Sequence, residues 1–157
     1  MGGSMRATWL ETAQEISVQQ MNQEGIQYEK IPASHYQVDL DRIKKNWNYT
    51  AQDVVELNPQ TPNLETICAK YDKEHLHTDD EVRYILSGQG YFDIRSRDDR
   101  WMHIFVEEGD FILVPSNRHH LFYLTHKKHI KAVRLFKENP SWTPIYRSAS
   151  LLTTSQK

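Results

Sequence analysis

The sequence predicts a mainly β protein in which short antiparallel strands form a closed or sandwiched barrel, preceded by a helical N-terminal part. From residue 81 onward, runs of β-branched and aromatic residues alternate with short runs rich in Gly, Asp, Asn, Ser and Lys. The first kind of run is typical of strands and the second of tight turns. Short strands at even spacing favour this architecture. The expected strands are residues 81–86, 91–95, 101–106, 111–115, 120–124 and 130–136.

The first 70 residues or so carry helical signals instead. Ser17 followed by Gln20 resembles a capping box, and Gly25 is placed to end the short helix that begins there. Residues 25–32 indicate a short strand. A second helix is indicated by apolar residues at helical spacing, namely Leu40, Ile43 and Trp47.

A third helix is expected where Thr50 and Asp53 have the spacing of a cap, ending near Leu57. Two prolines in residues 58–63 then indicate a loop. We expect this N-terminal part to pack on the outside of the barrel and to cover a sheet edge.

The size and composition fit one soluble domain. The chain has 157 residues, with 19 Lys and Arg against 21 Asp and Glu, so no strongly basic face for nucleic acid is expected. No apolar run approaches the roughly 20 residues that cross a bilayer, and the first residues lack the apolar core of a secretion signal. The single Cys68 suits a reducing, cytoplasmic setting, and a small buried apolar role fits it better than a nucleophilic one.

We divide the chain accordingly. Residues 1–5 are expected to be a remnant of cloning. Residues 6–147 are expected to form a single domain, helical to about residue 70 and a barrel beyond it. Residues 148–157 are expected to form a flexible tail.

A cluster of potential metal ligands begins just before the first barrel strand. His75 and His77 are two residues apart, so in a strand both side chains point to the same face. Glu81 has the same parity, but an unbroken strand would place it roughly 13 Å from His77. The intervening residues 78–80, "TDD", are turn-forming, and a bend there would bring the three side chains together.

A fourth ligand can come from the segment "GDFILVPSNRHH". Gly109 and Pro115 frame a buried strand, a tight turn follows, and His120 begins the next strand. Three imidazoles and one carboxylate would occupy four positions of an octahedron and leave two adjacent positions open, as in non-haem Fe(II) oxygenases. Surface histidines are the alternative for the His75–His77 pair alone, but the added glutamate and second segment favour a metal site.

Three segments resemble the cupin superfamily and, within it, the acireductone dioxygenase family. They are "EHLHTDDEVRYILSGQGYFDIR", "GDFILVP" and "AVRLFKENPSWTPIYR", and the resemblance covers residues 25–147. It implies a cupin double-stranded β-helix, or jelly-roll, barrel. It also selects His120 over the adjacent His119, because the family's last ligand lies five residues after the proline. Asn117 stands where cupins usually have glycine, and Asn tolerates a left-handed backbone.

The resemblance also implies a substrate pocket. Arg83 shares the inner face with Glu81, and there it would hold an anionic enediolate; a salt bridge to an internal carboxylate is the alternative. Arg134 matches a second family arginine, which either pairs with a carboxylate or supports the site. The aromatic residues that align with the family's pocket are Tyr71, Phe122 and Trp142, for which core packing is the alternative. No ligand role is expected for His35, His103, His126 and His129.

The function implied is that of a dioxygenase of methionine salvage. Its substrates would be O2 and the small acireductone 1,2-dihydroxy-3-keto-5-methylthiopentene, and its cofactor one Fe(II) or Ni(II) per chain. An iron form would give formate and 4-methylthio-2-oxobutanoate, and a nickel form methylthiopropionate, carbon monoxide and formate.

Two other functions stay open, namely another cupin dioxygenase or isomerase with the same ligands, and a non-catalytic metal-binding module. The expected location is the cytoplasm, with the nucleus as an addition in eukaryotes. The expected state is a monomer or weak homo-oligomer, without nucleic-acid or membrane partners.

Overall fold

The computed structural model describes residues 6–71, 75–76, 80–137 and 145–146, with the backbone alone at residues 71, 75–76 and 145–146. The helices are α1 (Val18–Gln23), α2 (Tyr36–Trp47) and α3 (Leu64–Tyr71). The strands are β1 (Arg6–Trp9), β2 (Gln27–Lys30), β3 (Ala51–Leu57), β4 (His75–Leu76), β5 (Glu81–Arg95), β6 (Trp101–Glu107), β7 (Asp110–Val114), β8 (His120–Leu124), β9 (Ile130–Phe136) and β10 (Ile145–Tyr146). None of the described helices is long and apolar enough to span a membrane.

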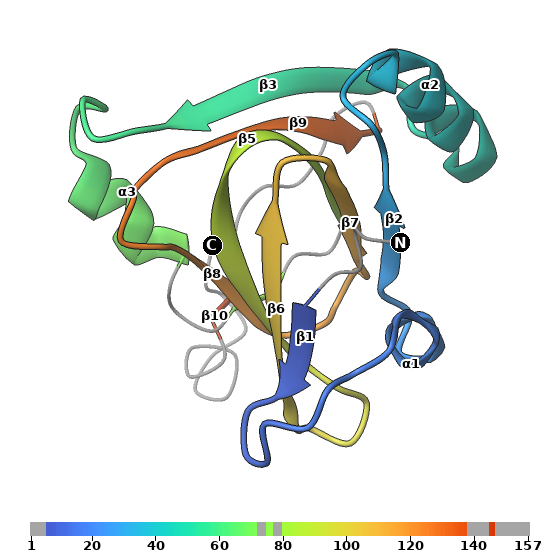
Figure 1. The fold of residues 1–157 in the computed structure, drawn as a ribbon, viewed down its shortest axis with the longest axis vertical. Coiled ribbons are helices and arrows are strands. Elements are labelled where there is room, and N and C mark those ends of the chain that lie inside the picture. Colours follow the sequence, from blue (N-terminus) through green and yellow to red (C-terminus); the bar gives the residue numbers. More distant parts are fainter. Residues whose placement is uncertain (1–5, 72–74, 77–79, 138–144, 147–157) are drawn as a thin grey trace.

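The strands form two antiparallel sheets that share β5. One sheet has the order β1-β6-β5-β8-β4-β10, and the other has the order β2-β7-β5-β9-β3. The strands curl around a common interior, and the helices lie outside them (Figure 1). This arrangement is the expected barrel. Because β5 belongs to both sheets, side chains along its inner face can meet side chains from either one.

The sharing depends on a change of direction within β5. Residues 81–88 pair with β7 and β9, and residues 89–95 pair with β6 and β8. The register shifts between Ile85 and Ser87, and Gly88 has a φ of +84°. A bulge followed by a left-handed glycine is a usual device for turning a strand from one sheet to another. The prediction that residues 87–90, "SGQG", form a turn between two strands was therefore wrong, because they continue a single strand.

Two apolar clusters hold the barrel together, one inside it and one outside. The inner cluster includes fully buried residues of β5, β6 and β7, among them Ile94, Ile104 and Ile112. The outer cluster packs Leu40 and Ile43 of α2 against residues such as Val82, Tyr84, Val133 and Leu135 of β5 and β9. Fully burying one such side chain contributes about 1.5–3 kcal/mol. Helix α2 of the N-terminal part therefore packs outside the barrel, as expected, whereas β1, β2 and β3 of the same part extend the two sheets.

The alternation along β5 decides which residues reach the interior. Val82 and Tyr84 belong to the outer cluster, so Glu81, Arg83 and Ile85 point to the opposite face. The hydroxyl of Tyr84 donates to the carbonyl of Ile31 at 2.8 Å, so its burial leaves no polar atom unsatisfied. The outer core thus fixes the register that directs the two charged residues inward.

The first two helices and the first short strand expected in the N-terminal part are present. The capping box at Ser17 and Gln20 is confirmed, and Gly25 follows the end of α1 with a φ of +88°. Leu40 and Ile43 are buried as predicted, but Trp47 is 45% exposed. Strand β2 is confirmed within residues 25–32, whereas β1 and α3 were not predicted.

The predicted third helix was wrong, because residues 51–57 form β3. This strand pairs with β9 over its whole length, from Ala51 to Leu57. Asp53 does not cap a helix; its carboxylate binds Arg134 on the neighbouring strand. Long-range pairing has overridden a local capping pattern. The expected division into domains is not tested, and residues 148–157 lie outside the described residues.

Replacing Gly88 by alanine should destabilise the protein more than the same change at Gly25. Both glycines have positive φ, but a Cβ at Gly88 would lie 2.3 Å from the carbonyl oxygen of His129, whereas at Gly25 the nearest atom is 3.5 Å away. Gly25→Ala should cost about 1 kcal/mol from backbone strain alone. Gly88→Ala should cost about 1–3 kcal/mol more from overpacking. Urea denaturation of both variants measures the free energy of unfolding. An equal loss in the two variants would contradict the close approach of Gly88 to the carbonyl of His129.

Candidate metal centre

Glu81 and His120 meet inside the barrel from different strands. Glu81 begins β5 and His120 begins β8, 39 residues later. The Nε2 atom of His120 lies 3.0 Å from Oε1 of Glu81, and the side chains are 2% and 5% exposed. Two buried polar groups in an apolar barrel are costly unless each has a partner. Their contact is therefore the first evidence for a built site.

The backbone fixes the proton on the His120 ring. Its Nδ1 lies 2.9 Å from the carbonyl oxygen of Arg118. A carbonyl oxygen only accepts, so Nδ1 carries the hydrogen and donates. In the neutral ring, Nε2 then presents a lone pair to the Glu81 carboxylate. Two lone pairs at this distance repel each other unless they share a proton or a cation.

The geometry fits a metal ion. Metal-binding histidines commonly donate their other ring N–H to a backbone carbonyl, as His120 does to Arg118. Two ligand atoms that bind one ion at about 2.1 Å and at right angles lie about 3.0 Å apart. An imidazolium–carboxylate hydrogen bond has a similar length, so the distance alone does not decide. Both a metal-bound ring and an imidazolium carry the hydrogen on Nδ1, and it is the donor set of imidazole and carboxylate that favours the metal ion.

The other two predicted ligands belong to the segment that joins α3 to β5. Strand β4 pairs with β8, and His75 stands opposite His120 in the register. The backbone of His75 is thus next to the Glu81–His120 pair. The side chain of His75 and all of His77 lie outside the described residues. Within the described part of the chain, no group of three His, Cys, Asp or Glu side chains could hold a metal, so the full ligand set stays a prediction.

Arg83 lies beside the pair on the same face of β5. Its Nη2 is 3.3 Å from Oε2 of Glu81, and its side chain is 12% exposed. Glu81 therefore uses one oxygen toward His120 and the other toward Arg83. The internal salt bridge that was the alternative role of Arg83 is present. It places the guanidinium at the edge of the site without excluding a contact with a bound anion.

A cavity of about 240 Å³ opens beside these residues. Its charged lining consists of Glu56, Glu81, Arg83 and Arg134. Its apolar lining, drawn from strands β3, β5, β8 and β9, consists of Val55, Leu57, Ile85, Phe92, Phe122, Ile130 and Ala132. Ligand pockets commonly combine an apolar wall with a few polar groups. The cavity could therefore take a small molecule with an anionic end and an apolar end.

Phe122 lies in the wall of this cavity, as predicted from its parity with His120. Its ring is 4.9 Å from that of Phe92. Gly90 makes room for it, because a Cβ there would lie 2.6 Å from two ring carbons of Phe122. The glycine thus sets how deeply the ring sits. The side chain of Tyr71 and all of Trp142 lie outside the described residues, so their pocket roles stay predictions.

Arg134 lines the cavity and binds the carboxylate of Asp53. Its Nε donates to Oδ1 at 2.8 Å and its Nη2 to Oδ2 at 2.5 Å, a two-pronged pair. Arg134 also stands directly opposite Arg83 across β9 and β5. The pairing with a carboxylate, one of the two roles considered from the sequence, is present, and the supporting role stays a prediction. Asp53 was missed because its spacing from Thr50 suggested a helix cap.

The remaining histidines are accounted for in other ways. His103 contacts Asp93 at 2.6 Å and stacks on Tyr91 on the outer face of the barrel. His129 contacts the hydroxyl of Ser87 at 3.0 Å. His35 and His126 are exposed, and His119, the residue before His120, is half-buried.

Replacing His120 by alanine should abolish metal binding, and replacing His119 should not. His120 presents Nε2 to Glu81 inside the barrel, whereas His119 precedes β8. Removing one of four ligands from a divalent site typically removes stable occupancy. Elemental analysis of both purified variants measures the metal content per chain. Normal metal in His120→Ala, or loss confined to His119→Ala, would contradict the assignment.

Comparison with known proteins gives the family. The model described as the ARD/ARD' family matches residues 6–144. The chain is 43% identical over 143 residues to "Acireductone dioxygenase" of Heterostelium pallidum (91% of this chain, 98% of the relative), and 40% identical over 137 residues to that of Rattus norvegicus (85% and 76%). The solved "Acireductone dioxygenase from Bacillus anthracis with cadmium ion in active center" superposes with a TM-score of 0.86 at 30% identity, covering 92% of this chain and all of that one. The cupin barrel is thereby confirmed, and the chain belongs to the acireductone dioxygenase family.

Proposed function

We propose that this chain oxidises 1,2-dihydroxy-3-keto-5-methylthiopentene with O2, using one divalent metal ion held by His75, His77, Glu81 and His120. The observation that carries the proposal is the buried contact between Nε2 of His120 and Oε1 of Glu81, 3.0 Å apart. Membership of the family supplies the reaction. Fe(II) or Ni(II) is the proposed ion. A bound ion would act as a Lewis acid that favours the deprotonated enediolate and lets it react with O2.

Arg83 is assigned to the charge on the substrate. The enediolate gains negative charge as it loses protons, and the guanidinium lies 3.3 Å from a Glu81 oxygen at the edge of the same site. A cation held in place by the fold stabilises such charge better than water does, because it needs no reorganisation as the charge develops. Arg83 is therefore proposed to bind and orient the deprotonated end of the substrate.

The apolar wall is assigned to the other end of the substrate. The methylthioethyl arm of an acireductone is apolar, and the cavity is lined by aliphatic side chains from β3 and β9 and by Phe122 of β8. Its volume of about 240 Å³ suits a small molecule rather than a polymer. Arg134, already paired with Asp53, is proposed to stiffen this wall.

The metal is proposed to decide the products. Ni(II) binds sites of nitrogen and oxygen ligands more tightly than Fe(II), so occupancy in a cell follows supply. The iron form is proposed to give formate and 4-methylthio-2-oxobutanoate, and the nickel form methylthiopropionate, carbon monoxide and formate.

The direct test mixes protein loaded with one metal, under anaerobic conditions, with acireductone and then adds O2. The loss of substrate absorbance should be much faster than without protein, and the carbon products should change between the iron and nickel forms. A rate equal to that of the protein-free reaction would show that the chain is a metal-binding module without catalytic activity. Turnover of a different enediolate in preference to this one would favour another cupin enzyme.

Replacing Arg83 by alanine should retain the metal and lower kcat by about 10²–10³, the loss expected when one charge-stabilising donor is removed. Arg83→Lys should recover part of the rate, because it keeps the charge but loses the two-pronged geometry. Arg42→Ala is a suitable control, since Arg42 forms an exposed ion pair with Glu29 on the outside of the barrel. Steady-state kinetics with parallel metal analysis decides the outcome. A fully active Arg83→Ala variant would remove its assigned role.

A further inference from the structure

We propose that Asp80 is a positioning residue that holds the two ligand-bearing segments together and so fixes the spacing between Glu81 and His120. This inference rests on the proposed ligand set and adds a residue to which no role has been assigned above. We call the contacts of Asp80 with Ser116 and Tyr49 the Asp80 clamp.

The clamp consists of two short hydrogen bonds to one carboxylate. The backbone N–H of Ser116 donates to Oδ1 of Asp80 at 2.8 Å, and the hydroxyl of Tyr49 donates to Oδ2 at 2.7 Å. Hydrogen bonds to an ionised carboxylate are roughly twice as strong as neutral ones. Each carboxylate oxygen of Asp80 therefore accepts a hydrogen bond, Oδ1 from Ser116 and Oδ2 from Tyr49.

The clamp acts on both ligand segments at once. Asp80 immediately precedes Glu81, so its position sets where β5 begins. Ser116 lies in the turn between β7 and β8, four residues before His120. Fixing Ser116 against Asp80 thus ties the turn that delivers one ligand to the residue next to the other.

The shape of this turn determines how His120 is held. Asn117 occupies a left-handed backbone conformation with a φ of +60°, as predicted from its tolerance of that region. The carbonyl of Arg118, the next residue, accepts the Nδ1 hydrogen of His120. A shift of the turn would therefore move the carbonyl that orients the ring and directs Nε2 toward Glu81.

Tyr49 connects the clamp to the outer core. Its side chain is 6% exposed and belongs to the cluster with Leu40, Ile43 and Val82. The hydroxyl that holds Asp80 is thus attached to a packed ring rather than to a mobile one. On the other side of the turn, Nη1 of Arg118 donates to the carbonyl of Arg95 at 3.1 Å. The turn consequently keeps this attachment when the clamp is removed, and such a variant is expected to fold.

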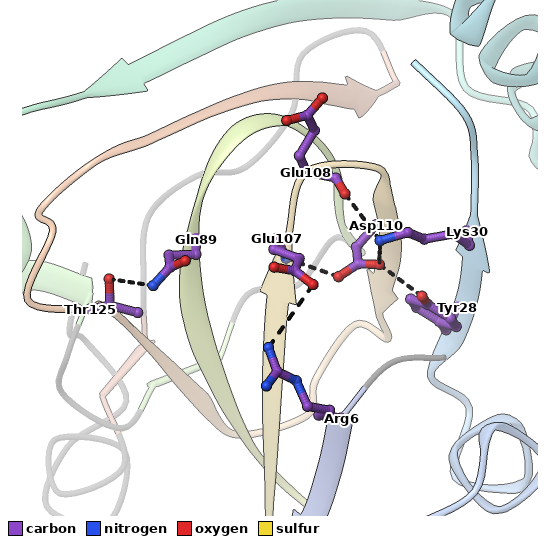
Figure 2. A network of polar contacts seen from close by, with 8 residues as sticks. All are labelled: Arg6, Tyr28, Lys30, Gln89, Glu107, Glu108, Asp110 and Thr125. Atoms are coloured by element: carbon purple, nitrogen blue, oxygen red, sulfur yellow. Dashed lines mark hydrogen bonds and ion pairs between the residues drawn. The ribbon is translucent and has the colours of Figure 1, made fainter. Parts of the chain in front are cut away.

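The chain contains a matched control in Asp110. This carboxylate also accepts from a tyrosine hydroxyl, Tyr28 at 2.7 Å, and from a backbone N–H, that of Glu107 at 2.8 Å (Figure 2). Lys30 adds a third contact at 3.1 Å. Asp110 is four residues from Val114, the register partner of Glu81, or roughly 13 Å along β7. Asp110 thus makes the same kinds of contact away from the predicted ligands.

The test measures the rate at which the Ni²⁺-loaded chain loses its metal to an excess of a chromogenic chelator. Asp80→Ala should release Ni²⁺ about 10- to 100-fold faster than the unchanged protein, the loss typical of residues that orient metal ligands. Asp80→Asn keeps an acceptor for the N–H of Ser116, so its release rate should lie between those of Asp80→Ala and the unsubstituted protein. Asp110→Ala should release Ni²⁺ at nearly the rate of the unsubstituted protein. Its thermal unfolding midpoint, measured without metal, should fall at least as much as that of Asp80→Ala.

The tyrosines provide a second pair that disturbs the fold less. Tyr49→Phe should release Ni²⁺ a few-fold faster, and Tyr28→Phe should not change the rate. Equal release from the Asp80 and Asp110 variants, or unchanged release from Asp80→Ala, would overturn the clamp. If Asp80→Ala does not fold, Asp80→Asn and Tyr49→Phe decide the question in the same way.

Failure of the clamp and failure of the proposed function give different results. Unchanged protein that retains Ni²⁺ through the clamp but does not turn over acireductone would reject only the proposed reaction. If the unsubstituted protein turns over acireductone but the Asp80 variants release Ni²⁺ at its rate, only the clamp is rejected. Unchanged protein that retains no Ni²⁺ would contradict the ligand set, and the clamp with it.

Discussion

The contact between a carboxylate and an imidazole in the interior of the barrel is the constraint on which the site depends. Glu81 and His120 are buried among apolar side chains, where an unpartnered charge or lone pair costs several kcal/mol. The backbone of Arg118 holds the ring hydrogen on the far nitrogen, so the facing nitrogen needs a cation or a proton. A metal ion or a proton shared between Nε2 of His120 and Oε1 of Glu81 would make this contact favourable, and Arg83 offsets the charge on the other oxygen of Glu81.

The rest of the fold arranges this contact from far apart in the chain. The outer core buries Val82 and Tyr84, and alternation then directs Glu81 and Arg83 inward. The bend at Gly88 lets the same strand pass into the second sheet, where Ile94 pairs with His120. Packing outside the barrel and the bend within β5 thus act together on one pair of atoms.

The sequence predicted those parts of the molecule that are determined locally. The capping box at Ser17 depends on two residues three apart, and the inward parity of Arg83 and Phe122 depends on strand alternation, so both could be found. Residues 51–57 could not, since their strand character comes from pairing with β9. Asp53 and Asp80 were missed for a similar reason. Their partners are 31 to 81 residues away in the chain, in the contacts Asp80–Tyr49, Asp80–Ser116 and Asp53–Arg134.

The central claim is that His120 and Glu81 share a metal ion, and a crystal structure of the Ni²⁺-loaded chain with anomalous diffraction at the nickel edge tests it most directly. The account predicts one anomalous peak within about 2.0–2.2 Å of both Nε2 of His120 and a carboxylate oxygen of Glu81. An ion bound elsewhere, with Nε2 of His120 still donating directly to Glu81, would contradict it.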